Sequence, residues 1–274
     1  MIRKIGQILL GLILSAGVAI AMGTWGLPEE KDLIAEAGMI RITASGIGAG
    51  ISMIVLLGFA NGWIGIHRRR DPGTGAGQIM NGIGFGLLPA IAAWKAFEQA
   101  GEIGTGSALP DGIPAWTWIT RDGNWIPARI EMALAICMFA AIVIWMMCRR
   151  QEMPDNGDLL GIAAVLWGAG RLVTDGFHRA ENGLFGMGSY TGWAAAGVMA
   201  IAMIAWTVRT GRQKKNTGYA WACIPVFFAA VTAIALVRNG FFQWQNPPAE
   251  LASMTCAALL AMKAALCMGR VSRN

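Results

Sequence analysis

The chain contains repeated apolar runs, each long enough to cross a lipid bilayer. A hydrocarbon core of about 30 Å requires an α-helix of roughly 20 apolar residues, and about eight such runs recur along the 274 residues. They cover residues 6–22, 43–66, 77–97, 130–148, 158–176, 188–208, 218–238 and 250–268. We therefore expect an all-α fold, a polytopic transmembrane helical bundle with about eight spans.

Composition and pattern both argue against a soluble domain or a strand barrel. Hydrophobic residues make up 55% of the chain and charged residues only 14%, whereas soluble domains are about one quarter charged. The runs are continuously apolar rather than alternating as barrel strands do, and helices satisfy their own backbone in lipid. We expect residues 1–274 to form a single integral membrane domain, with 98–129 as an external loop rich in Trp and Pro.

Basic residues follow every second run, and this alternation predicts the orientation of the chain. They are Arg3, Lys4, Arg68, Arg69, Arg70, Arg149, Arg150, Arg209, Arg212, Lys214, Lys215, Arg270 and Arg273. Loops rich in Lys and Arg stay on the cytoplasmic side, so we expect a multi-pass protein of the cytoplasmic membrane with both termini in the cytoplasm. The net charge of +6 is then a topology signal, and no nucleic-acid partner is expected.

The first run resembles a signal peptide, because Arg3 and Lys4 precede an apolar stretch that ends in Ala19-Ile20-Ala21. Cleavage there would leave seven spans and an external N-terminus. We favour an uncleaved anchor, because the span count and the alternating charges are consistent without cleavage.

Cysteine and histidine usage argues against a metal or redox site. The five cysteines all lie in predicted spans and lack the close spacing of metal ligands or a redox pair. The two histidines, His67 and His178, fall at opposite predicted faces. We expect neither a metal nor a cofactor.

Ionisable residues inside a membrane are costly and therefore mark candidate sites. Those near the predicted outer ends of spans are Lys95, Glu98, Arg129, Glu131, Arg171, Asp175, His178, Arg179, Glu181 and Arg238, while Lys263 lies inside the last span. For Lys95, Arg238 and Lys263 we expect snorkelling or solvation in loops. Arg171 requires an anion, which is either Asp175 at i+4 on the same helical face or a ligand.

The segment from Trp167 to Asp175 resembles the YGxxRFxxE motif of bacterial prolipoprotein diacylglyceryl transferases. Trp167 takes the place of the aromatic residue, Gly168 of the glycine, Arg171 of the arginine and Asp175 of the carboxylate. Three residues later, where the family has a second arginine, this chain has His178.

Three shorter segments extend the resemblance over residues 120–210. Met187-Gly188-Ser189 is similar to the family's MGQ helix start, and the segment Pro127–Glu131 to its PxxxYE helix opening. The segment Arg121–Trp125 is similar to RxGNF, although Thr120 replaces a glycine and an aspartyl-glycine turn explains it equally well. Two further spans follow the MGQ-like helix, and the family's polar arm is missing. The chain therefore looks like a diverged member.

The resemblance implies transfer of a diacylglyceryl group from phosphatidylglycerol to a lipobox cysteine thiol at the outer face of the cytoplasmic membrane. Implied partners are that phospholipid and a prolipoprotein signal peptide. The implied phosphate and substrate contacts are Arg171, Arg129, Asp175, Arg121, Asn124 and Trp167, and Glu131 or His178 would take the thiol proton. The alternative is a non-catalytic membrane protein, either a small-solute permease or an assembly factor that binds lipid or a partner.

Overall fold

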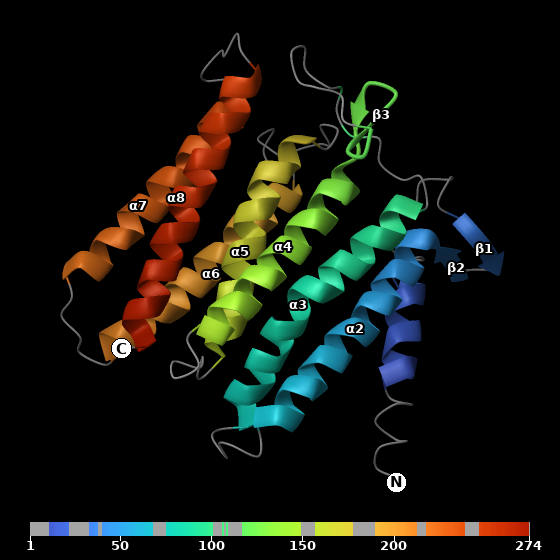
Figure 1. The fold of residues 1–274 in the computed structure, drawn as a ribbon, viewed down its shortest axis with the longest axis horizontal. Coiled ribbons are helices and arrows are strands. Elements are labelled where there is room, and N and C mark those ends of the chain that lie inside the picture. The colour runs from blue at the N-terminus through green and yellow to red at the C-terminus, as the bar shows by residue number, and fades with distance from the viewer. Residues whose placement is uncertain are drawn as a thin grey trace. The chain divides into compact units, whose positions relative to one another are not determined.

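The computed structural model describes residues 11–21, 33–37, 40–67, 75–100, 106, 108, 117–148, 157–177, 190–212, 218–238 and 247–273. The described residues are mainly helical (Figure 1). A helix over Gly11–Ala21 precedes α2 (Ala44–His67), α3 (Gly75–Ala100), α4 (Pro127–Cys148), α5 (Asp158–Thr174), the 3-10 turn η2 (Asp175–Phe177), α6 (Tyr190–Arg212), α7 (Gly218–Arg238) and α8 (Pro247–Arg273). The all-α class is confirmed, and each predicted run overlaps a helix.

Within the described ranges, five helices are long and apolar enough to cross a membrane. They are Ala44–Ile66, Gly75–Glu98, Pro127–Cys148, Gly192–Arg212 and Ala249–Val271, and two shorter apolar helices are Gly11–Ala21 and Trp221–Val237. Only 17% of the most apolar part of α4 is buried inside the protein, and Ile136, Ile144 and Met147 are exposed there. Helices that expose such side chains suit lipid rather than water. This is the pattern of a membrane protein, while the count of eight spans stays a prediction.

The chain forms two compact units. Unit 1 comprises residues 1–105 and 126–160, and unit 2 comprises 106–125 and 161–274. The boundary falls inside α5, so its first residues belong to unit 1 and the remainder to unit 2.

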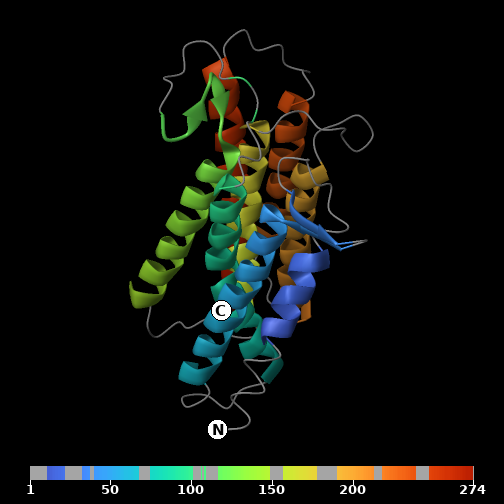
Figure 2. The same ribbon diagram turned by 90° about the vertical axis from the view of Figure 1, so that its right-hand side faces the viewer.

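In unit 1, α2 and α3 lie antiparallel and in close contact (Figure 2). A Cβ added at Gly82 would meet the backbone of Ala60 at 3.0 Å, and one at Gly48 would meet Phe97 Cβ at 2.8 Å. These small residues let the backbones approach, as in other membrane helix pairs. The aromatic rings of Phe59, Phe85 and Phe139 pack together and join α4 to the pair.

The start of α5 is fixed against the middle of α3. The side-chain oxygen of Asn81 accepts a hydrogen bond from the backbone N–H of Leu159 at 3.0 Å, which satisfies one of the unpaired donors of a helix start. Gly157, just before α5, has φ +87°, and a Cβ there would meet Met80 Cβ at 2.9 Å. The Asn81 side chain and the lack of a side chain at Gly157 together allow the start of α5 to lie this close to α3.

Replacing Asn81 with alanine is expected to destabilise the protein by about 1–3 kcal/mol, because the buried N–H of Leu159 loses its acceptor. Thermal unfolding of the purified protein in detergent measures this as a fall in Tm of several degrees. Thr255→Val is the control, since the Thr255 hydroxyl donates to the carbonyl of Leu251 in its own helix. Equal Tm values for the two variants would contradict the role of Asn81 as the cap of α5.

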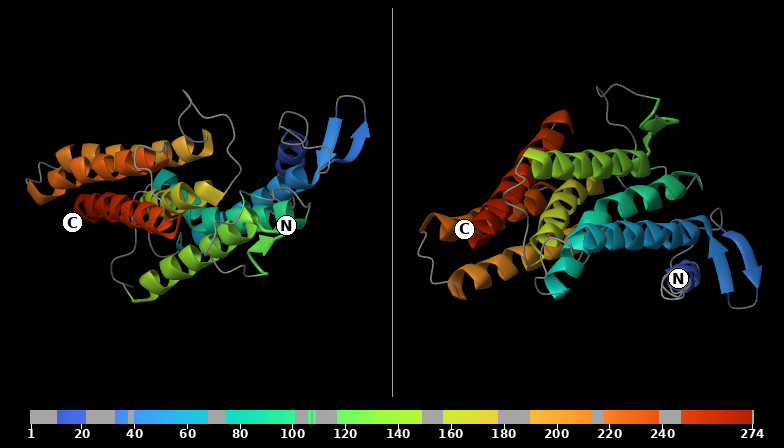
Figure 3. Two further views of the ribbon diagram at one scale, coloured as in Figure 1. Left: turned by 90° about the horizontal axis from the view of Figure 1, so that it is seen from above. Right: turned by 60° about the horizontal axis from the view of Figure 1, so that its bottom comes forward.

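A β-hairpin that was not predicted from the sequence precedes α2. Strand β1 (Leu33–Ala37) pairs antiparallel with β2 (Ile40–Thr43), and the hairpin projects from the start of α2 (Figures 2 and 3). Glu36 and Arg41 face each other across the strands with an ion pair of 3.1 Å. The Thr43 hydroxyl accepts the N–H of Gly46 at 3.0 Å, so it caps α2.

In unit 2, α7 and α8 lie against each other (Figure 1). Trp206 of α6 fills a slot between two glycines. A Cβ at Gly161 of α5 would meet the Trp206 indole at 2.5 Å, and one at Gly269 of α8 would meet it at 3.0 Å. The indole is buried. Side-chain packing at this point therefore holds α5, α6 and α8 together.

A second hairpin, which lies in unit 2, confirms the predicted aspartyl-glycine turn. Strand β3 (Thr120–Arg121) pairs antiparallel with β4 (Asn124–Trp125). Asp122 and Gly123 between them have φ values of 50° and 74°, the left-handed conformation of a two-residue hairpin turn. Asp and Gly are among the residues that tolerate it best.

Candidate functional site

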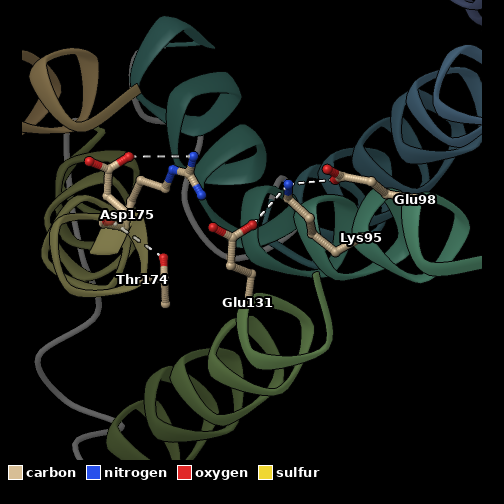
Figure 4. Close-up of polar contacts among 6 residues, drawn as sticks. Lys95, Glu98, Glu131, Thr174 and Asp175 are labelled. Carbon is tan, nitrogen blue, oxygen red and sulfur yellow. Dashed lines mark hydrogen bonds and ion pairs between the residues drawn. The ribbon is translucent and has the colours of Figure 1, made fainter. Parts of the chain in front are cut away.

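Arg171 and Asp175 form a buried ion pair at the end of α5. Arg171 lies in the last turn of α5 and Asp175 opens η2, so the i,i+4 spacing predicted from the sequence is present. A nitrogen of the guanidinium lies 3.8 Å from Asp175 Oδ1, and the two side chains are 11% and 0% exposed (Figure 4). This distance is longer than a direct hydrogen bond, so the carboxylate compensates the cation without the bidentate geometry that binds arginine most tightly.

Close helix packing fixes the turn that carries Arg171. Gly168 lies one turn earlier, and a Cβ there would meet Met199 Sδ at 2.9 Å and the carbonyl oxygen of Ala195 at 3.0 Å. The buried hydroxyl of Thr174 donates to the carbonyl of Arg171 at 3.4 Å (Figure 4). The glycine of the motif-like segment therefore has a packing role against α6.

The second hairpin is anchored to the same helix end. The rings of Trp125 and Phe177 are 4.7 Å apart, and the Trp125 carbonyl accepts the N–H of Gly106 at 2.7 Å. Because Phe177 follows Asp175 by two residues in η2, this contact brings the hairpin segment to the end of α5. Two segments that resemble family motifs thus meet within unit 2.

Arg121 and Asn124 make contacts within their own turn. Arg121 pairs with Asp122 at 3.7 Å, with side chains 57% and 84% exposed. The Asn124 amide donates to the carbonyl of Asp122 at 3.1 Å. These contacts are those of a hairpin turn, and the predicted role of Arg121 and Asn124 in substrate binding stays a prediction.

Glu131 lies in a second cluster of charges, in unit 1. Lys95 Nζ of α3 is 2.8 Å from Glu131 Oε2 of α4 and 2.5 Å from Glu98 Oε2 one turn along α3 (Figure 4). The Lys95 and Glu131 side chains are 10% and 0% exposed. The expectation that Lys95 snorkels or is solvated in a loop is therefore wrong: its ammonium is held between two carboxylates, which compensates the cost of burying it.

Two further predicted site residues, Arg129 and Trp167, lie in these helices. Arg129 is half-buried in the first turn of α4, and its backbone N–H bonds the carbonyl of Ile126. Trp167 is half-buried in α5, one turn before Arg171. His178 and the MGQ-like segment 187–189 lie outside the described residues. Arg129 and Glu131 belong to unit 1, and Arg171, Asp175 and Trp167 to unit 2.

The sequence does not predict three contacts at these clusters: Trp125 with Phe177, Lys95 with Glu131, and Gly168 with α6. The i,i+3 spacing of Lys95 and Glu98 is a visible signal for their pairing. The three contacts named above join segments far apart in the chain, and no local pattern specifies them.

No protein-family model matches this chain, and neither a curated protein nor a solved structure shows significant similarity to it.

Proposed function

We propose that this protein transfers a diacylglyceryl group from phosphatidylglycerol to the cysteine thiol of a lipobox peptide at the outer membrane–water interface. The observation that supports the proposal is the buried Arg171–Asp175 pair at the end of an apolar helix, within a segment that resembles the family's motif.

An arginine in this position suits the binding of a phosphodiester. Its planar guanidinium matches two phosphate oxygens at once, whereas an ammonium acts as a point charge. Asp175 sets the orientation of Arg171 from 3.8 Å. A lipid phosphate that approaches from the membrane interface would attract the Arg171 guanidinium more strongly than Asp175 does, because negative charge accumulates on the phosphate as the reaction proceeds.

The reaction uses no nucleophilic side chain of the enzyme. The peptide sulfur forms a bond to the terminal glyceryl carbon of the lipid, and the bond from that carbon to the phosphate oxygen breaks. The electron pair leaves with glycerol phosphate, whose phosphate gains one negative charge. The thiol proton passes to a base in the surrounding solvent. Stabilising the new phosphate charge is the proposed role of Arg171.

The test is transfer of label from phosphatidylglycerol with a radioactive acyl chain to a synthetic lipobox peptide, using the purified protein in phospholipid vesicles. We expect the peptide to gain the mass of one diacylglyceryl group. A peptide with serine in place of the cysteine is the control and should stay unlabelled.

A protein that binds phosphatidylglycerol but leaves the cysteine peptide unmodified would instead be a lipid-binding assembly factor. Solute uptake into vesicles that does not depend on Arg171 would indicate a permease. Either result would contradict the transferase proposal.

A further inference from the structure

The exposed residues of α6 form one continuous stripe along the helix. They recur at intervals of three or four residues, which is the spacing of one helical face, and they are Trp193, Ala194, Gly197, Val198, Ile201, Ile204, Ala205, Val208, Gly211 and Arg212. Met199 and Trp206 on the other face are buried. Helix α6 therefore has one packed face and one exposed face.

The exposed face is apolar where a helix in water would be polar. From Trp193 to Val208 the stripe carries no charged side chain, and in its middle Ile201 is 69% exposed and Ile204 56%. A surface helix of a soluble protein presents charged and polar residues on this face. An apolar face of this length indicates contact with lipid.

The two ends of the stripe carry residue types that membranes hold at their interfaces. Trp193 lies at one end and Arg212 at the other. Tryptophan is enriched at the level of the headgroups, and an arginine at a helix end extends its charge into the same layer. The two residues are 19 positions apart, which is about 28 Å of helix, close to the thickness of a hydrocarbon core of about 30 Å.

Two packing contacts determine which part of α5 lies level with the start of α6. Gly161 of α5 packs against the indole of Trp206, and Gly168 packs against the carbonyl oxygen of Ala195. The later residue of α5 meets the earlier residue of α6, so the two helices are antiparallel. The end of α5 therefore lies beside the beginning of α6.

Arg171 and Trp193 consequently lie at the same end of this helix pair and at a similar depth. Arg171 follows Gly168 by three residues, and Trp193 precedes Ala195 by two. We propose that the exposed face of α6 is a surface through which unit 2 contacts lipid, and that Trp193 keeps the Arg171 guanidinium at the depth of the lipid phosphates. The lipid contact stands without the proposed function, whereas the positioning of Arg171 for a phosphate rests on it.

An indole at this place supplies what an apolar face alone lacks. Acyl chains offer the same surroundings over a range of depths, so the depth and tilt of a membrane helix are set by its neighbours and by anchors at the interface. A displacement of one helical turn, about 5.4 Å, would carry the guanidinium of Arg171 out of hydrogen-bond reach of the phosphate layer. Trp193 is therefore a positioning residue.

Fluorescence quenching in vesicles measures the depth of α6 in the purified full chain. A fluorescent amino acid is placed at one position at a time, in phospholipids brominated either near the headgroup or near the middle of the membrane. We expect shallow bromine to quench reporters at Ala194, next to Trp193, and at Arg212 more strongly. Deep bromine should quench a reporter at Ile201 more strongly. All three side chains are exposed, so the reporters replace no packed group.

Two quenching results would overturn the lipid contact or the depth of Trp193. Stronger quenching of the Ala194 reporter by deep bromine would overturn the interfacial position of Trp193. Three reporters that neither bromine quenches would show that water or a second copy of the chain covers this face, and would overturn the lipid contact. Neither result depends on whether the protein labels a peptide.

Trp193→Ala tests the positioning of Arg171. Without the indole the site spends part of its time at the wrong depth, and the apparent affinity for lipid falls with the competent fraction. The mole fraction of phosphatidylglycerol that gives half-maximal peptide labelling should rise severalfold, while the rate at saturating phosphatidylglycerol stays near the wild type. Trp193→Tyr should restore the wild-type value, because tyrosine also prefers the interface. Phe228→Ala, at an exposed aromatic residue in the middle of α7, is the control and should change neither value.

Failure of this inference and failure of the proposed function are distinguishable. Equal half-maximal mole fractions in Trp193→Ala and the wild type would overturn the positioning role and leave the transferase standing. If the wild type labels no peptide, the transferase proposal falls, and binding of phosphatidylglycerol replaces labelling as the measurement for Trp193→Ala. If the wild type neither labels nor binds, the positioning role falls with the proposed function, and the quenching profile still decides the lipid contact of α6.

Discussion

Replacing Arg171 with alanine is expected to reduce the rate of peptide labelling by about 10²- to 10³-fold, the usual loss when one preorganised donor to a developing negative charge is removed. The guanidinium is the charge proposed to hold the lipid phosphate, and Asp175 lies 3.8 Å from it. Rates measured under saturating phosphatidylglycerol separate this effect from weaker binding. Arg212→Ala, at an exposed arginine of α6, is the control and should label at the wild-type rate.

Loss of folding must be distinguished from loss of the reaction, because Arg171→Ala leaves the buried Asp175 without the cation seen in the structure. Breaking a buried ion pair on one side costs about 3–5 kcal/mol, whereas removing both partners is much less damaging. The double variant Arg171→Ala/Asp175→Ala should therefore recover a Tm close to the wild type and remain inactive. A double variant that labels peptide normally would rule out a role for Arg171 in phosphate binding.

Replacing Gly84 with alanine, which adds one methyl group, is expected to destabilise the protein strongly. A Cβ at Gly84 would overlap the backbone of Leu159 and Leu160 at the start of α5. Overpacking usually costs about 1–3 kcal/mol, and backbone atoms cannot move aside as a side-chain end can, so we expect the upper part of this range or more. Tm should fall by about 10 °C, or the protein should fail to accumulate in membranes.

Gly58→Ala is the matched control for this experiment, because it makes the same chemical change in a neighbouring helix. Gly58 lies in α2, is exposed, and a Cβ there would meet nothing within 4 Å. Alanine also favours the helix over glycine, so the control should be neutral or slightly stabilising. If both variants unfold at the same temperature, the close approach of α3 and α5 is not required for stability.

The helices of this protein could be predicted because each corresponds to a local sequence pattern. An apolar run of sufficient length specifies a membrane helix without reference to any other segment, and all eight runs overlap helices. The turn at Asp122 and Gly123 was equally local, since two adjacent residues tolerate the positive φ values. The hairpin of β1 and β2 is not among the elements predicted from the sequence, which concern the long apolar runs.

The candidate site was predictable only where its residues share one helix. Arg171 and Asp175 are four residues apart, so their contact follows from helical geometry. Lys95 and Glu131 are on different helices, and their pairing depends on how α3 and α4 pack. The expectation of snorkelling for Lys95 is wrong for this reason. Snorkelling follows from the lysine and the membrane alone, whereas here Glu131 of the next helix supplies a carboxylate that pairs with the ammonium.

The slot that holds Trp206 connects the C-terminal helix α8 to helices that precede it in the chain. Gly269 near the end of α8 forms one wall of the slot, and Gly161 near the start of α5 forms another. Without α8 the indole of Trp206 would lose one of the surfaces that bury it, and α6 would lose a direct neighbour. The C-terminal helix α8 is thus packed, through Trp206, against the same helix that carries Arg171, so a change at Gly269 is felt in α5 as well.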